Sequence, residues 1–174
     1  MLPRVVLFTI SDTRTVENDD SGRALADALG ATCEIVRREI VRDEPENIAA
    51  LVREITANRS ADAIVTSGGT GIAPRDRTYE ALESLFEKKL DGFGEAFRRI
   101  SFDAIGPRAI LSRATAGVVA NVLVFALPGS VKGASLGARE LIAPILMHAV
   151  DLVNGRTHHH HDATAATAAA KKKR

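Results

Sequence analysis

The segment of residues 63–78, Ala-Ile-Val-Thr-Ser-Gly-Gly-Thr-Gly-Ile-Ala-Pro-Arg-Asp-Arg-Thr, constrains the fold of this chain more than any other. It opens with a short apolar run that predicts a buried strand, and a helical pattern begins again near Thr78. The glycines between them allow the backbone to approach a phosphate closely, and free N–H groups at the start of the next helix point toward it. A strand, a glycine turn and a helix in this order predict an anion-binding turn.

The glycine turn matches neither of two common phosphate-binding motifs. It is not Gly-x-Gly-x-x-Gly, and no lysine follows the glycines as it does in a phosphate loop. Instead Asp76 follows five residues after Gly71. A carboxylate beside a bound phosphate repels it unless a divalent cation lies between them, which indicates metal-assisted phosphate chemistry. The other interpretation is a tight turn with Asp76 near a helix start, and this segment alone leaves both open.

Strands and helices alternate along the chain. Apolar runs predict strands at residues 4–10, 33–41, 63–67, 113–118 and 122–126. Apolar spacings of three and four predict helices at residues 24–29, 45–55 and 78–86, a short helix around Phe97, and a long helix after Ser130 that Pro144 should kink. This alternation predicts an α/β protein with a mostly parallel sheet and helices on both faces.

Polar loops follow four of the predicted strands. In parallel sheets, ligands bind beyond the carboxyl ends of the strands, so loops that follow parallel strands gather on one rim. The four loops are Ser11-Asp12-Thr13, Asp43-Glu44, residues 67–71 with Asp76, and Pro128-Gly129-Ser130. Their convergence, more than any single motif, predicts a functional site at this rim.

Several of these residues also have purely structural interpretations. Asp43-x-x-Glu46 matches a capping box at the start of a helix. Ser130 fits the N-cap of the last helix, and Ser112-Arg113 fits either a ligand contact or a surface pair. No Cys/His cluster predicts a zinc site, and the Gly-x-Ser-x-Gly motif of serine hydrolases is absent.

Composition narrows the class of protein. The chain has 174 residues and one cysteine, Cys33, so an internal disulfide framework is excluded and a reducing compartment fits. No apolar run reaches the roughly 18 residues of a membrane-spanning helix, and no signal-peptide pattern precedes Arg4, so we expect a cytoplasmic protein with no membrane partner.

The charge is distributed unevenly. Residues 156–174 include His158 to His161 and hold five basic residues and one acidic residue, so the rest of the chain is mildly acidic although the whole carries +1. A mildly acidic body argues against a nucleic-acid partner. We therefore expect one α/β domain over residues 1–155 and a disordered tail over residues 156–174.

Five ordered motifs together resemble one known family. The chain resembles the molybdopterin-binding proteins of molybdenum cofactor biosynthesis, which include molybdopterin adenylyltransferases and molybdenum cofactor biosynthesis protein B. The resemblance extends from Arg4 to about Gly155 and is most specific in residues 66–76, 92–98, 101–108, 111–114 and 127–130. Gly92-Phe-Gly-Glu95 and Ser101-Phe102 are most similar to the protein B branch.

The resemblance implies a three-layer α/β/α sandwich and a homotrimer, which pairs into a hexamer in the protein B branch. It also implies that Mg²⁺-ATP adenylylates the terminal phosphate of molybdopterin and releases pyrophosphate. Asp43 and Asp76 match the two acidic residues that serve this chemistry and hold Mg²⁺. Some protein B members lack the acid at the position of Asp43, whereas this chain keeps both.

The resemblance further implies a pocket for phosphate, pterin and nucleotide, and a molybdenum-inserting enzyme as downstream partner. The pocket residues are Ser11, Asp12, Ser67, Gly68, Gly69, Thr70, Gly71, Ser112, Arg113, Pro128, Gly129 and Ser130. Phe93, Phe97 and Phe102 are expected to anchor the oligomer, because aromatic residues commonly anchor interfaces. Phe93 and Phe97 also fit a place in the core. Two alternatives remain: a non-catalytic molybdopterin carrier, and a phosphate- or nucleotide-binding regulatory module unrelated to pterins.

Overall fold

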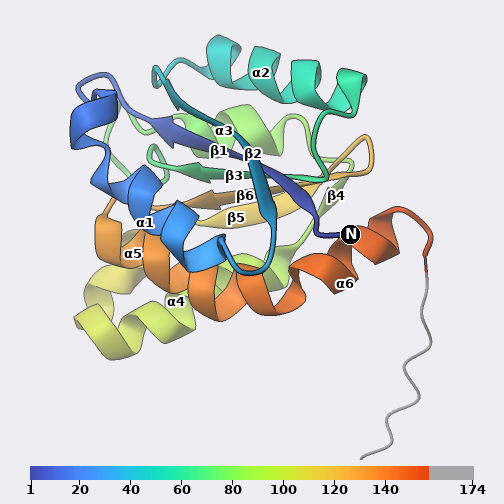
Figure 1. Cartoon of the computed structure of the whole chain (residues 1–174). Coiled ribbons are helices and arrows are strands. Elements are labelled where there is room, and N and C mark those ends of the chain that lie inside the picture. Colours follow the sequence, from blue (N-terminus) through green and yellow to red (C-terminus); the bar gives the residue numbers. More distant parts are fainter. Residues whose placement is uncertain (157–174) are drawn as a thin grey trace, which may run out of the picture.

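The computed structural model describes residues 1–156, which form a six-stranded sheet in the order β2-β1-β3-β6-β5-β4 (Figure 1). The strands β1, β2, β3 and β6 are parallel. At one edge β5 pairs antiparallel with β6, and β4 pairs antiparallel with β5. In chain order they are β1 (Arg4–Ile10), β2 (Glu34–Val41), β3 (Ala63–Ser67), β4 (Lys88–Lys89), β5 (Thr115–Val119) and β6 (Val122–Leu127). The predicted mostly parallel sheet is confirmed.

Two helical layers cover the sheet, so the predicted three-layer α/β/α sandwich is confirmed (Figure 1). One layer packs on the core that contains Val6, Phe8 and Ile64, and the other on the core that contains Leu7, Val65 and Phe125. The first layer is α2 (Pro45–Asn58) and α3 (Thr78–Glu83). The second is α1 (Asp20–Leu29), α4 (Asp91–Ile105), α5 (Val131–Gly137) and α6 (Ala143–Val153).

The central strands are buried on both faces. Every residue of β3 and β6 is buried, whereas β2 at the sheet edge alternates between exposed and half-buried positions. Continuous apolar sequence suits a strand covered on both sides. The turn between β5 and β6 places Ala120 and Asn121 at φ 46° and 65°, the positive values that a tight two-residue hairpin requires.

Helix α4 is longer than the short helix predicted around Phe97, because its glycines do not interrupt it. A Cβ at Gly94 would lie 2.6 Å from the carbonyl oxygen of Ala114, so this glycine permits close packing of the helix against the start of β5. Phe93 and Phe97, which we expected to anchor an interface, are buried in the core of their own chain. That part of the expectation is wrong, and only Phe102 is exposed.

The predicted long C-terminal helix is interrupted where Pro144 suggested. A π-helical segment, η3 (Ala138–Ile142), separates α5 from α6, and Pro144 lies in the first turn of α6. Proline has no N–H to donate to the preceding turn, which favours such an irregularity. Two short 3₁₀ helices, η1 (Val16–Asn18) and η2 (Gly106–Leu111), complete the fold.

Two further findings bear on the sequence-based expectations. Within residues 1–156 no helix combines the length and the apolar character needed to cross a bilayer. The predicted tail, apart from Arg156, lies outside the described residues, so its disorder stays a prediction.

Candidate functional site

The loops at the carboxyl ends of the parallel strands meet, as predicted. The Ser11 N–H donates to the carbonyl of Val41, and the Asp43 N–H donates to Asp12 Oδ1 at 3.1 Å. On the other side, the Gly68 N–H donates to the carbonyl of Leu127 at 3.0 Å. The loops after β1, β2, β3 and β6 therefore form one continuous rim.

The glycine turn after β3 needs its glycines. Gly68 and Gly69 have φ values of 116° and 64°, which other residues rarely adopt. A Cβ at Gly68 would lie 3.1 Å from the carbonyl carbon of Ile10. The N–H groups of Gly69, Thr70 and Gly71 donate no hydrogen bond within residues 1–156. Three successive unpaired N–H groups are the donors that anion-binding turns use.

Asp43 lies against this turn in an unfavourable environment for a charge. A Cβ at Gly69 would lie 2.9 Å from Asp43 Oδ2, and Asp43 Oδ1 is buried without a hydrogen-bond partner in the described chain. Burial raises the pKa of Asp43, and the charges of Asp76 and Asp12 raise it further, against the opposing effect of the Arg77 backbone and Arg75. A cation beside Asp43 would relieve this cost.

The capping-box alternative for Asp43 is not supported. Helix α2 begins at Pro45, its N-cap residue is Glu44, and that residue makes no side-chain cap. Asp43 lies one residue too early to act as the cap. The capping alternative for Ser130 is confirmed, because its hydroxyl accepts from the Gly133 N–H at 3.2 Å.

Asp76 is held by its own loop. Its Oδ2 accepts from the Ala73 N–H at 2.9 Å, and its N–H donates to the Ala73 carbonyl at 2.9 Å. A Cβ at Gly71 would lie 2.6 Å from Asp76 Oδ2, so the glycine lets the carboxylate approach the turn. Asp12, the third carboxylate of this rim, forms an ion pair with Arg75.

The donors at the rim fit a hard cation, although incompletely. Carboxylate oxygens suit Mg²⁺, and the partnerless Asp43 Oδ1 is the kind of atom that such an ion satisfies. Across residues 1–156, however, His, Cys, Asp and Glu side chains nowhere form a group of three placed to hold a metal ion. The remaining ligands would therefore come from substrate phosphates and water, as is usual for Mg²⁺.

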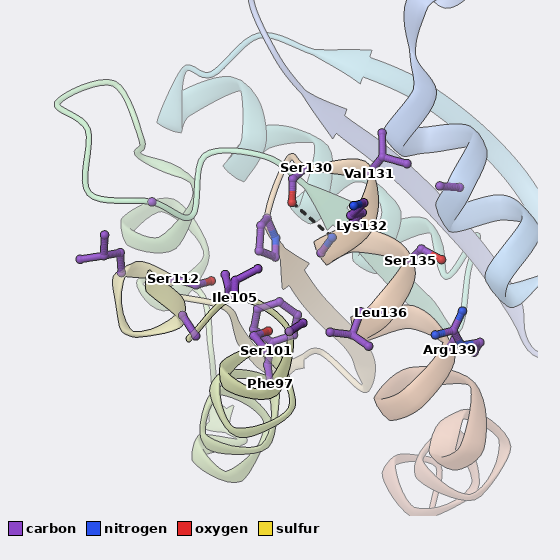
Figure 2. Close-up of a pocket in the computed structure, with 17 residues that line it drawn as sticks. Phe97, Ser101, Ile105, Ser112, Ser130, Val131, Lys132, Ser135, Leu136 and Arg139 are labelled. Carbon is purple, nitrogen blue, oxygen red and sulfur yellow. Dashed lines mark hydrogen bonds between the residues drawn. The ribbon is translucent and has the colours of Figure 1, made fainter. Parts of the chain in front are cut away.

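A cavity of about 710 Å³ opens beside the glycine turn, with Gly71 in its wall (Figure 2). Figure 2 shows Phe97 and Ser101 of α4 facing Leu136 of α5. The charged residues in its wall are Lys132 and Arg139, both cationic. Apolar surface with two cations suits a flat organic ligand that carries negative charge.

The structure divides the predicted site residues into groups. Gly71, Ser112, Pro128 and Ser130 line the cavity. Asp12, Asp43, Asp76 and Gly69 form the carboxylate rim.

The remaining predicted residues support the loops. Ser67 is buried and its hydroxyl donates to Ser21 Oγ at 3.3 Å. Ser11 Oγ accepts from the N–H groups of Thr13 and Arg14, both at 3.2 Å. Arg113 lies behind the glycine turn and is absent from the cavity wall.

Sequence reasoning missed a buried polar network under the rim. Asp19 is 1% exposed and accepts from Thr9, the Gly22 N–H and Arg38. Burial alone would raise the pKa of Asp19, but these hydrogen bonds outweigh it and the pKa is lowered.

Arg14 connects this network to the rim. Its guanidinium lies 3.7 Å from Asp19 Oδ1 and donates to the Gly129 carbonyl at 3.0 Å. In the sequence Asp19 has only the appearance of a helix cap, because its partners Arg38 and Thr9 are distant in the chain.

Comparison with known proteins agrees with this geometry. The sequence model of a family described as "probable molybdopterin binding domain" matches residues 6–148. The chain belongs to this family. The family expectation drawn from the five motifs is thereby confirmed.

Individual relatives fall in the protein B branch. Molybdenum cofactor biosynthesis protein B of Bacillus subtilis (strain 168) is 45% identical over 149 residues, which cover 84% of this chain and 88% of the relative. A crystal structure of a molybdenum cofactor biosynthesis protein B superimposes with a TM-score of 0.85 at 40% identity, covering 89% of this chain and 98% of the other. The structure of the molybdopterin biosynthesis enzyme MoaB from Thermus thermophilus gives a TM-score of 0.79 at 38% identity, and the match covers 88% of this chain and 98% of the other.

Proposed function

We propose that this protein acts in molybdenum cofactor biosynthesis as a molybdopterin adenylyltransferase. The observation that carries the proposal is the pair Asp43 and Asp76 beside a glycine turn with three available N–H donors. The family's description and the names of the relatives support the pterin as substrate. A molybdenum-inserting enzyme would use the product, and we propose a homotrimer or a pair of trimers as the assembly.

The cavity is assigned to the pterin. Its wall combines Phe97 and Leu136, which suit a flat ring, with the cations Lys132 and Arg139, which suit the negative charge of the ligand. Because Gly71 belongs to both the cavity wall and the glycine turn, a ligand in the cavity can extend its phosphate to the turn.

The reaction needs no nucleophile from the protein. An oxygen of the molybdopterin phosphate attacks the α-phosphorus of ATP, the bond from that phosphorus to the bridging oxygen breaks, and pyrophosphate leaves with the electron pair. Catalysis then depends on position and charge. The N–H groups of Gly69, Thr70 and Gly71 orient a phosphate, and Asp43 and Asp76 would hold Mg²⁺. When bound there, Mg²⁺ supplies neutralisation of the triphosphate charge.

The test replaces each carboxylate by its neutral amide. Asp43→Asn and Asp76→Asn should each lower Mg²⁺-ATP-dependent adenylylation by about a hundredfold or more, because an amide is a much poorer ligand for a hard cation. Molybdopterin affinity should remain, because neither carboxylate lines the cavity. The product is measured as adenylylated pterin, and the affinity by titration calorimetry.

The matched control is Asp62→Asn. Asp62 is also half-buried, but it lies at the opposite end of β3 and binds Arg4, so turnover should be kept. Near-normal turnover in both site variants would contradict the catalytic assignment. A wild-type protein that binds molybdopterin without forming product would instead support the carrier function.

A further inference from the structure

We infer that Arg113 is a positioning residue that fixes the loop carrying Asp76, an inference that rests on the proposed role of Asp76. Its backbone N–H donates to the Thr70 carbonyl at 2.8 Å. Its guanidinium donates from Nε to the Gly71 carbonyl and from Nη2 to the Asp76 carbonyl, both at 2.8 Å. One residue thus binds the loop at its start and at its end.

The Arg113 guanidinium is itself held in place by residues of α3. Its Nη1 forms an ion pair with Glu80 of α3, and its guanidinium carbon lies 5.1 Å from the centre of the Tyr79 ring. The hydrogen bond from Arg113 lowers the pKa of Glu80. Lys89 of β4 holds Tyr79 in turn, with its Nζ 2.8 Å from the phenolic oxygen. The guanidinium therefore has a fixed plane, which three directed hydrogen bonds require.

The loop has few other connections to the body. Between Gly71 and Asp76, residues 72–75 are exposed. The two bonds between Ala73 and Asp76 are internal to the loop. Within residues 1–156, Arg75 of the loop forms an ion pair with Asp12, and beyond the loop the Thr78 N–H donates to the Gly69 carbonyl at 3.1 Å. The exposed ion pair contributes little and the Thr78 bond lies outside residues 71–76, so within the loop Arg113 is the main contact that holds Asp76.

Arg113 acts through the loop rather than on a ligand. It lines a recess of about 390 Å³ together with Tyr79, Lys89 and Arg98, and it does not line the large cavity. Its three guanidinium nitrogens already donate to two carbonyls and to Glu80. Lysine cannot replace it, because a single ammonium lacks the planar fork that reaches two carbonyls at once.

The first experiment measures the loop without any substrate. Arg75 and Arg77 are trypsin sites in or next to the loop, and cleavage there is followed by mass spectrometry. Arg113→Met should speed cleavage at these two sites by about tenfold or more, because local opening becomes easier. The matched control is Arg98→Met. It removes another guanidinium that lines the same recess, but it loses only a hydrogen bond of 3.3 Å to the Ser112 carbonyl. It should leave cleavage at the wild-type rate.

The second experiment measures the consequence for the proposed reaction. Arg113→Met should lower kcat and raise the Mg²⁺ concentration for half-maximal rate, each by about tenfold, with the KM for molybdopterin unchanged. Arg113→Lys should recover only a small part of the kcat that Arg113→Met loses. In an Asp76→Asn background, Arg113→Met should lower kcat little further, because both substitutions act through the Asp76 carboxylate.

The outcomes separate this inference from the proposed function. If Arg113→Met is cleaved faster than the wild type but the wild type forms no adenylylated pterin, the positioning role of Arg113 stands and the proposed adenylyltransferase activity is rejected. Wild-type cleavage in Arg113→Met, or equal acceleration in Arg98→Met, would overturn the inference. A raised KM for molybdopterin with unchanged kcat and Mg²⁺ dependence would also overturn it, because Arg113 would then contact the pterin directly.

Discussion

Asp43 and Asp19 are two carboxylates whose hydrogen-bond environments differ. Asp43 lies in the rim, and Asp19 lies in the buried polar network under it. Asp19 is buried but receives hydrogen bonds from Thr9, Gly22 and Arg38. Asp43 has a buried oxygen without a partner in the described chain and two carboxylates as neighbours. Residues that lower stability are retained where function needs them, which supports the proposed functional role of Asp43 and a structural role for Asp19.

The two residues should therefore respond to pH in opposite directions. Because the pKa of Asp43 is raised above its ordinary 3.8, the folded state keeps this proton to higher pH, and stability falls as pH rises from 3.8 through the folded pKa. Asp43→Asn should thus unfold at higher urea than the wild type near neutral pH, and the advantage should vanish in acid.

Asp19→Asn is the control, and its effect on stability should have the opposite sign. The pKa of Asp19 is lowered, so its contribution to stability is complete above its unfolded pKa and is lost as pH falls through the folded pKa. This variant should be less stable than the wild type near neutral pH, with the difference shrinking in acid. Urea midpoints across a pH series measure both, and a destabilised Asp43→Asn at neutral pH would contradict the assignment.

At the scale of elements, the connection between β3 and α3 determines the site. It carries three N–H groups without an acceptor in residues 1–156 and the Asp76 loop at the end of the buried strand β3, and it lies against the Asp43 carboxylate of the loop after β2. Two of its glycines have positive φ values, and the space beside Gly69 is occupied by Thr78 and Asp43. A side chain at Gly69 would therefore displace Thr78 or the Asp43 carboxylate.

Gly69→Ala tests this element. The strained φ and the contacts with Thr78 and Asp43 should cost about 1–3 kcal/mol of unfolding free energy and abolish adenylylation. Gly92→Ala is the control, because nothing lies within 4 Å of a Cβ there and the residue is helical. That control should be neutral or more stable by up to about 1 kcal/mol. Denaturation midpoints give the comparison, and a silent Gly69→Ala would show that the turn tolerates a side chain.

For the whole molecule, an exposed apolar surface bears on the assembly. The end of α4 and the following η2 expose a group of large apolar side chains in consecutive turns. They are Phe102, Ile105, Ile110 and Leu111, with exposed fractions of 48%, 56%, 68% and 48%. Ile105 and Leu111 also line the large cavity, whereas Phe102 and Ile110 do not. Exposed apolar side chains gathered in one segment commonly mark an interaction site. It agrees with the expected homo-oligomer, although Phe93 and Phe97 do not take part.

Light scattering at micromolar concentration should therefore give the mass of a trimer or of a pair of trimers. Phe102→Glu should lower the mass, because a buried charge at an interface is costly. Val16→Glu, an equally drastic change at a 74% exposed position in η1, should not. A strictly monomeric wild type would contradict the assembly, and an unchanged mass for Phe102→Glu would place the interface elsewhere.

The α/β class and the position of the rim could be predicted from the amino-acid sequence. Apolar runs and helical spacings are local properties of the chain, so strands β1, β3 and β6 lie where the pattern predicts them. The rule that ligands bind beyond the carboxyl ends of parallel strands then brings Asp43, Asp76 and Ser130 to one side of the sheet. The glycines at 68 and 69 could also be interpreted locally, because φ is a property of single residues.

The role of each side chain could be assigned only from the folded chain. Whether Asp43 caps a helix or lies beside Gly69 with one unpaired carboxylate oxygen depends on the residue at which α2 begins and on how the loop after β2 packs against the glycine turn. Arg113 and Asp19 make their decisive contacts with residues far along the chain, such as Asp76 and Arg38. Burial and hydrogen bonds between distant segments have no local pattern in a sequence, so these roles appear only when the chain is folded.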